Sequence, residues 1–253
     1  MPAPANKLKE ALLQGAVQKG LWMGLASPTV AELASHAGFD WCLIDAEHGP
    51  NDLLSIQNQL QAMNGAPAAP VVRVPVAEDW MLKQVLDLGA QNVLIPMIDT
   101  GEEAAKAVAA CRYPPHGIRG LGSALARASG YNAISDYPTT SNDQICVMVQ
   151  AESRAAIDNI DAIAGTEGVD VVFIGPADLS ADMGYLGQLD APEVEEVIAH
   201  AISRIRAAGK VAGIVLFNPD DFPRYLDMGA GFLGMGSDVT SLAASLRDLA
   251  RSV

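Results

Sequence analysis

The chain has 253 residues, half of them hydrophobic, and a formal net charge of −14; this suits a single domain, residues 1–253, around one large core. The acidic balance argues against nucleic-acid binding, because neutralising phosphates requires clustered Lys and Arg. No apolar run is long enough to span a bilayer, and Met1–Lys9 lacks the apolar core of a signal peptide, so we expect a protein with no membrane contact. The three cysteines, Cys42, Cys111 and Cys146, are scattered and odd in number, which suggests a reducing cytoplasm.

Strand-like apolar runs alternate with helix-like runs along the whole chain, which is typical of parallel α/β folds. After a leading helix over Lys7–Gln18, eight strands are expected near Trp22–Ala26, Trp41–Ile44, Val71–Val74, Asn92–Pro96, Ile145–Val149, Val171–Ile174, Val211–Leu216 and Phe232–Met235. Helices are expected between them, for example over Asp52–Met63, Trp80–Leu88, Glu102–Cys111 and Glu193–Ala208, with a last helix over Ser241–Arg251.

This order predicts a (β/α)8 TIM barrel. A doubly wound open sheet is the alternative, but it usually has fewer strands. No Gly-x-Gly-x-x-Gly follows the first strand, which argues against a nucleotide cofactor.

His48 follows the second expected strand, at the end where TIM barrels carry their catalytic residues. Histidine titrates near neutrality and can act as a general base once a carboxylate orients its ring, a role for which Asp45 is close enough in sequence. The alternative is a histidine that only structures its loop.

Arg73 lies inside the third expected strand, where a buried cation is costly unless it meets an anion. We interpret it as an arginine that reaches the barrel mouth and stabilises a developing oxyanion. A structural salt bridge is the alternative.

The segment from Tyr113 to Asn142 has little periodicity and is unusually long for a connection inside a compact domain. Its Arg119 and Arg127 could bind an anionic substrate or a neighbouring subunit. A solvated loop without such a role is an equal alternative.

Two acidic residues follow consecutive strands, Glu152 in Gln150-Ala151-Glu152 and Asp178 in Gly175-Pro176-Ala177-Asp178. In a barrel of parallel strands these ends lie side by side on the catalytic face. Converging carboxylates suit a hard divalent cation, so we predict a metal site for Mg2+, Mn2+ or Co2+.

None of the six lysines follows a strand at the catalytic end, so a Schiff-base mechanism is not expected. The glycines around Gly234-Met235-Gly236-Ser237 suggest either a phosphate-binding loop or simply a tight turn. Leu216, at the end of the seventh strand, is a candidate for shaping an aldehyde pocket, with barrel-mouth packing as the alternative.

Together these segments resemble the HpcH/HpaI aldolase family over about Trp22 to Arg247. The resemblance rests on ordered stretches, namely residues 43–49 (LIDAEHG), 70–73 (PVVR), 112–127 (RYPPHGIRGLGSALAR), 149–152 (VQAE) and 173–180 (FIGPADLS). Gly49 and the glycines near Met235 depart from the pattern expected of the closest members, which leaves the aldehyde partner open.

The resemblance implies a hexamer of barrels in which the final helix packs on a partner subunit. It implies that Glu152 and Asp178 hold the metal, that His48 is the base, that Arg73 stabilises the transition state and that Asp45 pairs with the histidine. Asp87 matches an acidic residue credited with raising that histidine's basicity, reaching it from a neighbouring subunit. The positions around bound pyruvate are Gln150, Gly175, Pro176, Ala177 and Asp178.

The expected activity is that of a class II pyruvate aldolase of aromatic catabolism. It would reversibly cleave 4-hydroxy-2-oxoheptanedioate to pyruvate and succinic semialdehyde through a metal-bound pyruvate enolate. A sugar-acid aldolase acting on 2-dehydro-3-deoxyglucarate is one alternative. A phosphoenolpyruvate mutase-like or CoA-ester lyase barrel is another, although it would need a more cationic surface. A catalytically silent metabolite-binding barrel is the least favoured, since binding needs no base beside a metal.

Overall fold

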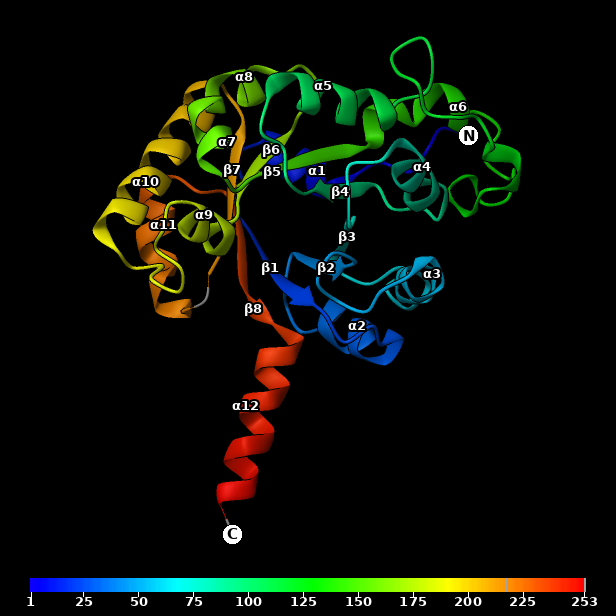
Figure 1. Cartoon of the computed structure of the whole chain (residues 1–253). Helices are drawn as coiled ribbons and strands as arrows, with labels where there is room; N and C mark the ends of the chain where they lie inside the picture. The colour runs from blue at the N-terminus through cyan, green and yellow to red at the C-terminus, as the bar shows by residue number, and fades with distance from the viewer. Residues whose placement is uncertain (217, 253) are drawn as a thin grey trace.

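The computed structural model describes residues 1–216 and 218–252, in which eight parallel strands close into a barrel in chain order (Figure 1). The strands are β1 (Gln18–Met23), β2 (Trp41–Asp45), β3 (Ala69–Arg73), β4 (Asn92–Ile95), β5 (Cys146–Ala151), β6 (Val171–Ile174), β7 (Val211–Val215) and β8 (Phe232–Ser237). Pairing of β1 with β8 closes the sheet, so the predicted (β/α)8 barrel is confirmed and the open-sheet alternative is wrong.

Helices follow the strands and form the outer layer of the barrel (Figure 1). Several begin at side chains that accept a hydrogen bond from the first turn, such as Ser27, Asp52, Thr100 and Ser153. The outer helices are α2 (Pro28–Ser35), α3 (Leu53–Ala62), α4 (Asp79–Asp87), α5 (Gly101–Ala110), α7 (Arg154–Asp158), α8 (Ile160–Gly165), α9 (Pro176–Asp182), α10 (Pro192–Ala207) and α11 (Phe222–Met228).

The barrel interior is filled by every second residue of the strands, since side chains alternate between the two faces of a sheet. In β2, Trp41 and Leu43 point inward, and the Trp41 ring stacks on Phe232 with centroids 4.1 Å apart. The same alternation makes Asp45, two residues after Leu43, the next inward-facing residue of β2, at the mouth of the barrel. The interior core therefore ends in a polar layer at the carboxyl ends of the strands.

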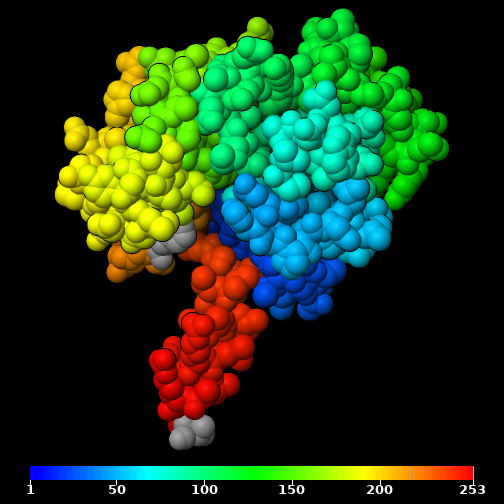
Figure 2. Space-filling view, in the orientation of Figure 1, coloured from blue at the N-terminus to red at the C-terminus, as the bar shows by residue number. Residues whose placement is uncertain are grey.

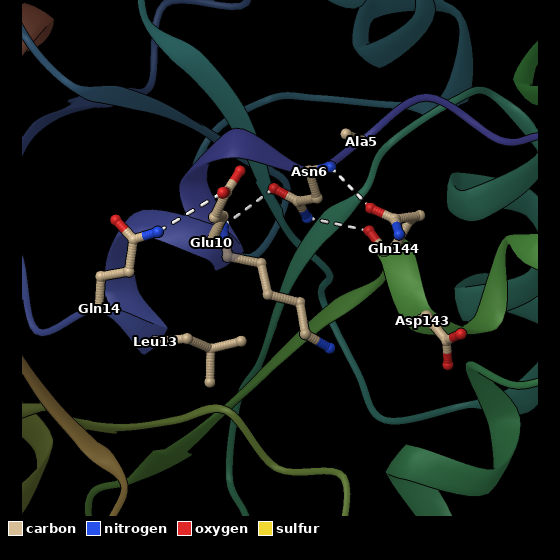
Figure 3. A pocket seen from close by; sticks show the side chains of 8 residues that line it. Ala5, Asn6, Glu10, Leu13, Gln14, Asp143 and Gln144 are labelled. Carbon is tan, nitrogen blue, oxygen red and sulfur yellow. Dashed lines mark hydrogen bonds between the residues drawn. The ribbon is translucent and has the colours of Figure 1, made fainter.

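The N-terminal helix α1 (Lys7–Leu13) covers the opposite end of the barrel, where Leu8 and Leu12 join the interior core. It is shorter than the predicted Lys7–Gln18, because Gly15 has a φ of +78° and turns the chain into β1. A pocket beside α1, shown in Figure 3, is lined by side chains that already bind one another: the Asn6 side chain donates to the Gln144 carbonyl at 3.0 Å, and the Asn6 N–H donates to the Gln144 side chain at 2.8 Å.

β1 was predicted four residues too late, at Trp22–Ala26, whereas the strand spans Gln18–Met23. The residues after it form a turn in which the N–H groups of Gly24 and Leu25 donate to the Asp238 carboxylate. That bond joins the end of β1 to the start of the last helix.

The last helix, α12 (Asp238–Arg251), leaves the barrel and extends away from it (Figures 1 and 2). Leu242, Leu246 and Leu249 are 48%, 56% and 68% exposed and follow a spacing of four and three residues, so they share one face of the helix. The long segment between α5 and β5 contains only short helical turns, among them α6 (Tyr137–Thr140). None of the helices in the described ranges is both long and apolar enough to cross a membrane.

Candidate active site

A cavity of about 450 Å³ opens at the carboxyl ends of the strands. It brings together most of the residues that the sequence singled out, although they come from six different strands or the loops after them. Its lining consists of Trp22, Asp45, His48, Arg73, Gln150, Phe173, Gly175, Pro176, Ala177, Asp178, Val215, Leu216, Gly236, Ser237 and Thr240.

Arg73 forms a buried ion pair with Asp45, its register partner on the neighbouring strand. Arg73 Nε and Nη2 donate to the two Asp45 carboxylate oxygens at 2.9 and 2.7 Å, a bidentate arrangement. Burial by itself raises the pKa of Asp45, but the hydrogen bonds and charge of Arg73 outweigh it and hold that pKa below its usual value. The salt bridge expected as an alternative for Arg73 is therefore present, and Arg73 still lines the cavity.

His48 lies at the cavity rim with its side chain exposed. Its backbone N–H donates to Asp45 Oδ1 at 3.3 Å, and that carboxylate also binds the Glu47 N–H at 3.0 Å. The hydrogen bonds of the Asp45 carboxylate therefore go to Arg73 and to the backbone, and none of those in the described chain reaches the imidazole ring. The suggestion that Asp45 orients the His48 ring does not match this geometry.

Glu152 is a buried carboxylate directly after β5. Its Oε1 accepts the Met97 N–H at 2.8 Å and its Oε2 accepts from the Gln150 side chain. Met97 has a φ of +55°, an uncommon conformation for a residue other than glycine, and this turn after β4 aims its N–H at Glu152. Burial raises the pKa of Glu152 to about 7, and the charges of Glu47 and Asp178 contribute to the increase.

Gly175, Pro176, Ala177 and Asp178 form the turn from β6 into α9, beside Glu152. Gly175 has no space for a side chain, since a Cβ there would lie 2.5 Å from Glu152 Oε2. Asp178 is in the first turn of α9 and its side chain is exposed to the cavity. The Asp178 carboxylate is near enough to Glu152 for its charge to help raise the pKa of Glu152.

The charges around the cavity fit a divalent cation. Carboxylates outnumber the one guanidinium at this end of the barrel: Asp45 and Glu47 contact Arg73, Asp178 lines the cavity, and the buried Glu152 is bonded to the lining residue Gln150. No three His, Cys, Asp or Glu side chains in residues 1–216 and 218–252 converge as a complete ligand set. Two carboxylates with water and substrate are nevertheless a common ligand set for Mg2+, so Glu152 and Asp178 fit the predicted ion.

Asp87 and the two arginines of the long segment lie elsewhere. Arg119 is buried and donates to Asp87 Oδ1 at 2.6 Å, and Arg127 donates to the carbonyls of Leu88 and Leu60. Asp87 does not line the cavity of its own chain. Both arginines thus form hydrogen bonds with groups of their own chain, outside the cavity lining, and the suggestion that they contact substrate is not supported.

At the glycine-containing end of β8 and the start of α12, backbone N–H groups that could bind an anion are already bonded. The Thr240 N–H is taken by Ser237 Oγ, and the Asp238 carboxylate occupies the N–H groups of Gly24 and Leu25 beside it. A negative charge already lies there, which disfavours the phosphate-binding alternative. Gly236 and Leu216 do line the cavity.

Sequence reasoning missed Trp22, Phe173, Thr240 and Glu47. Trp22 and Phe173 looked like ordinary strand residues, and only the closure of the barrel places their rings 5.4 Å apart at the cavity floor. Glu47 lies between Asp45 and His48, directly after β2, so its acidic side chain and its position at a strand end could have marked it as a candidate site residue.

Comparison with known proteins agrees with this geometry. Residues 18–245 match the family HpcH/HpaI aldolase/citrate lyase. The chain is 56% identical over 249 residues to a hydroxypyruvate/pyruvate aldolase of Agrobacterium fabrum, covering 98% of this chain and 94% of the relative. It is 52% identical over 245 residues to a 4-hydroxy-2-oxo-heptane-1,7-dioate aldolase of Salmonella dublin, covering 97% and 93%.

A crystal structure of an HpcH/HpaI aldolase/citrate lyase family protein from Burkholderia cenocepacia has the same fold. It aligns with a TM-score of 0.95 at 38% identity, covering 98% of this chain and 99% of that one. The family match, the identities to relatives and the barrel with its acidic cavity agree: this chain belongs to the HpcH/HpaI aldolase/citrate lyase family.

Proposed function

We propose that this protein is a divalent-metal-dependent aldolase that reversibly joins a 2-oxo acid of the pyruvate class to an aldehyde. The observation that carries the proposal is one cavity lined by Asp178, His48 and Arg73, with the buried Glu152 carboxylate bonded to Gln150, another of the lining residues. Relatives above 50% identity are named as aldolases of pyruvate, hydroxypyruvate or 4-hydroxy-2-oxo-heptane-1,7-dioate.

Glu152 and Asp178 would hold the metal, and Gln150 would lie next to it through its contact with Glu152. Bound there, a Mg2+, Mn2+ or Co2+ ion supplies Lewis-acid stabilisation of the charge that develops on the 2-oxo acid. The backbone N–H groups of Ala177 and Asp178, in the first turn of α9, are suited to the carboxylate of the same substrate.

His48 and Arg73 would act on the oxygen that becomes the aldehyde. His48, exposed at the rim, removes the C4 hydroxyl proton during cleavage, directly or through one water, and returns it in the reverse direction. Arg73 stays protonated and stabilises negative charge on that oxygen without exchanging protons.

The substrate is proposed to be 4-hydroxy-2-oxoheptanedioate, with pyruvate and succinic semialdehyde as products. The relatives named for hydroxypyruvate make this second donor a specific alternative, since they include the A. fabrum protein at 56% identity. 2-Dehydro-3-deoxyglucarate remains the sugar-acid alternative.

The direct test is product analysis with metal-stripped protein, to which Mg2+, Mn2+ or Co2+ is returned. Pyruvate with succinic semialdehyde identifies the heptanedioate, pyruvate with tartronic semialdehyde identifies the sugar acid, and condensation of added hydroxypyruvate with an aldehyde identifies the second donor. Arg73→Ala should lower turnover far more than metal affinity. Full activity after verified metal removal would contradict the proposal.

We also propose that α12 packs on another copy of the chain, in the hexamer that the resemblance implied. Its leucine face, Leu242, Leu246 and Leu249, is exposed, and the helix stands clear of its own barrel (Figure 2). A reducing cytoplasm is the proposed location, because the cysteines Cys42, Cys111 and Cys146 are buried and unpaired.

A further inference from the structure

Glu47, the residue after the buried ion pair, is held against the same guanidinium. The Asp45 carboxylate accepts the N–H groups of Glu47 and His48, and the Asn51 side chain donates to the Asp45 carbonyl at 2.7 Å. These bonds fold the chain back after β2. Glu47 Oε2 then lies 2.6 Å from Arg73 Nη1.

The Arg73 guanidinium is therefore restrained on three sides. A guanidinium has five N–H donors, of which Asp45 takes two, on Nε and Nη2. Glu47 faces Nη1, and the Trp22 ring covers one face with its centroid 5.3 Å from Cζ. The donors left over belong to the two terminal nitrogens, and Arg73 lines the cavity.

Charge balance alone does not explain Glu47. The bidentate pair with Asp45 already neutralises Arg73, so a second carboxylate adds a negative charge in a partly buried place, which costs free energy of desolvation. Its Oε2 makes no hydrogen bond of good angle in the described chain, so the contact with Nη1 is electrostatic. A carboxylate that is partly buried at a cost in desolvation, and that is not needed to neutralise Arg73, points to a role in function.

We infer that Glu47 is a positioning residue that acts through Arg73, restraining Nη1 so that the remaining N–H groups of the guanidinium face the reacting oxygen. The inference rests on the proposed function, in which Arg73 stabilises charge on that oxygen. Asp45 fixes the plane of the guanidinium, and Glu47 prevents it from rocking about the Asp45 carboxylate.

The test is a double-mutant cycle of Glu47→Gln and Arg73→Lys, measured in the metal-loaded enzyme. Glu47→Gln keeps the side-chain volume and should lower kcat about 10- to 100-fold, the size of effect expected from misplacing a catalytic group. The KM for substrate and the Kd for Mn2+ should change less than about twofold, because Glu47 is inferred to act in the transition state and not on binding of the substrate or the metal. In the Arg73→Lys background the same change should lower kcat less than about twofold.

Two further variants make the result specific. Glu47→Asp keeps the charge but shortens the side chain, and its kcat should lie between those of wild type and Glu47→Gln. Glu102→Gln is the matched control: Glu102 is an exposed carboxylate in the first turn of α5 and pairs with Lys106 on the same helix. Its kcat should equal that of wild type.

An equal loss of kcat in both backgrounds would overturn the inference, because Glu47 would then act independently of Arg73. Weakened Mn2+ binding in Glu47→Gln would also overturn it and would make Glu47 part of the metal site. Absence of aldolase activity in the wild-type protein with every donor and metal would refute the proposed function, and the inference with it. Thermal melting of each variant shows whether the fold is retained.

Discussion

Gly175→Ala should weaken metal binding without distorting the backbone. Gly175 has a φ of −91°, which alanine adopts freely, so the substitution tests space alone. A Cβ there would lie 2.5 Å from Glu152 Oε2, 2.9 Å from Glu152 Cβ and 3.0 Å from Gln150 Nε2. Both neighbours are buried and hydrogen-bonded to each other, so neither can move away cheaply.

The size of the effect follows from overpacking. Inserting one carbon into a well-packed site costs about 1–3 kcal/mol. If the displaced Glu152 carboxylate transfers that cost to the metal complex, the Kd for Mn2+ rises about 5- to 140-fold, at about 1.4 kcal/mol per factor of ten.

Titration of metal-stripped protein with Mn2+, followed by electron paramagnetic resonance, measures this Kd. Gly165→Ala is the matched control, because Gly165 ends α8 and a Cβ there meets no atom within 4 Å. An unchanged Kd in Gly175→Ala, or an equal change in the control, would refute the reasoning that places Glu152 at the metal.

Two further predictions concern stability and assembly. Asp45→Asn removes a carboxylate from a buried ion pair and should lower the free energy of unfolding by about 3 kcal/mol near neutral pH. Arg73 lowers the pKa of Asp45 in the folded state, so the stability difference between wild type and Asp45→Asn should be complete above the unfolded pKa of about 4 and shrink as pH falls further. Urea denaturation from pH 7 to 3 measures this difference, and a difference that does not change with pH would contradict the prediction. Changing Leu242, Leu246 and Leu249 together to Ser should reduce the native mass measured by light scattering while the barrel remains folded, and an unchanged oligomer would rule out α12 as the contact.

Much of the fold could be predicted from the sequence because parallel strands buried on both faces are continuous apolar runs. β1 was the exception. It begins with the polar residues Gln18 and Lys19, and Gln18 pairs with Phe232 of β8, a partner at the other end of the chain. Only barrel closure makes that polar start a strand, so local hydrophobicity shifted the prediction toward Trp22 and Leu25.

The sequence could single out candidate residues where a charged or polar side chain follows a strand, as for Glu152, Asp178 and His48, or lies within one, as for Arg73. It could not predict a contact where a partner is a backbone group. Arg127 binds two carbonyl oxygens, and carbonyls carry no signal in a sequence. The expected Asp45–His48 pairing is not formed among the described residues for a related reason: register places Asp45 beside Arg73, and the Asp45 carboxylate binds Arg73 and two backbone N–H groups.

The central claim is that Glu152 and Asp178 hold a metal that activates a pyruvate-class 2-oxo acid. Exchange of the pyruvate methyl protons in deuterated water, followed by NMR, tests this step without assuming which aldehyde is used. We predict exchange in the wild-type protein with Mg2+ or Mn2+, none after metal removal, and none in Glu152→Ala at any metal concentration that saturates the wild type. Exchange that persists without metal, or in Glu152→Ala with unchanged metal affinity, would contradict the account.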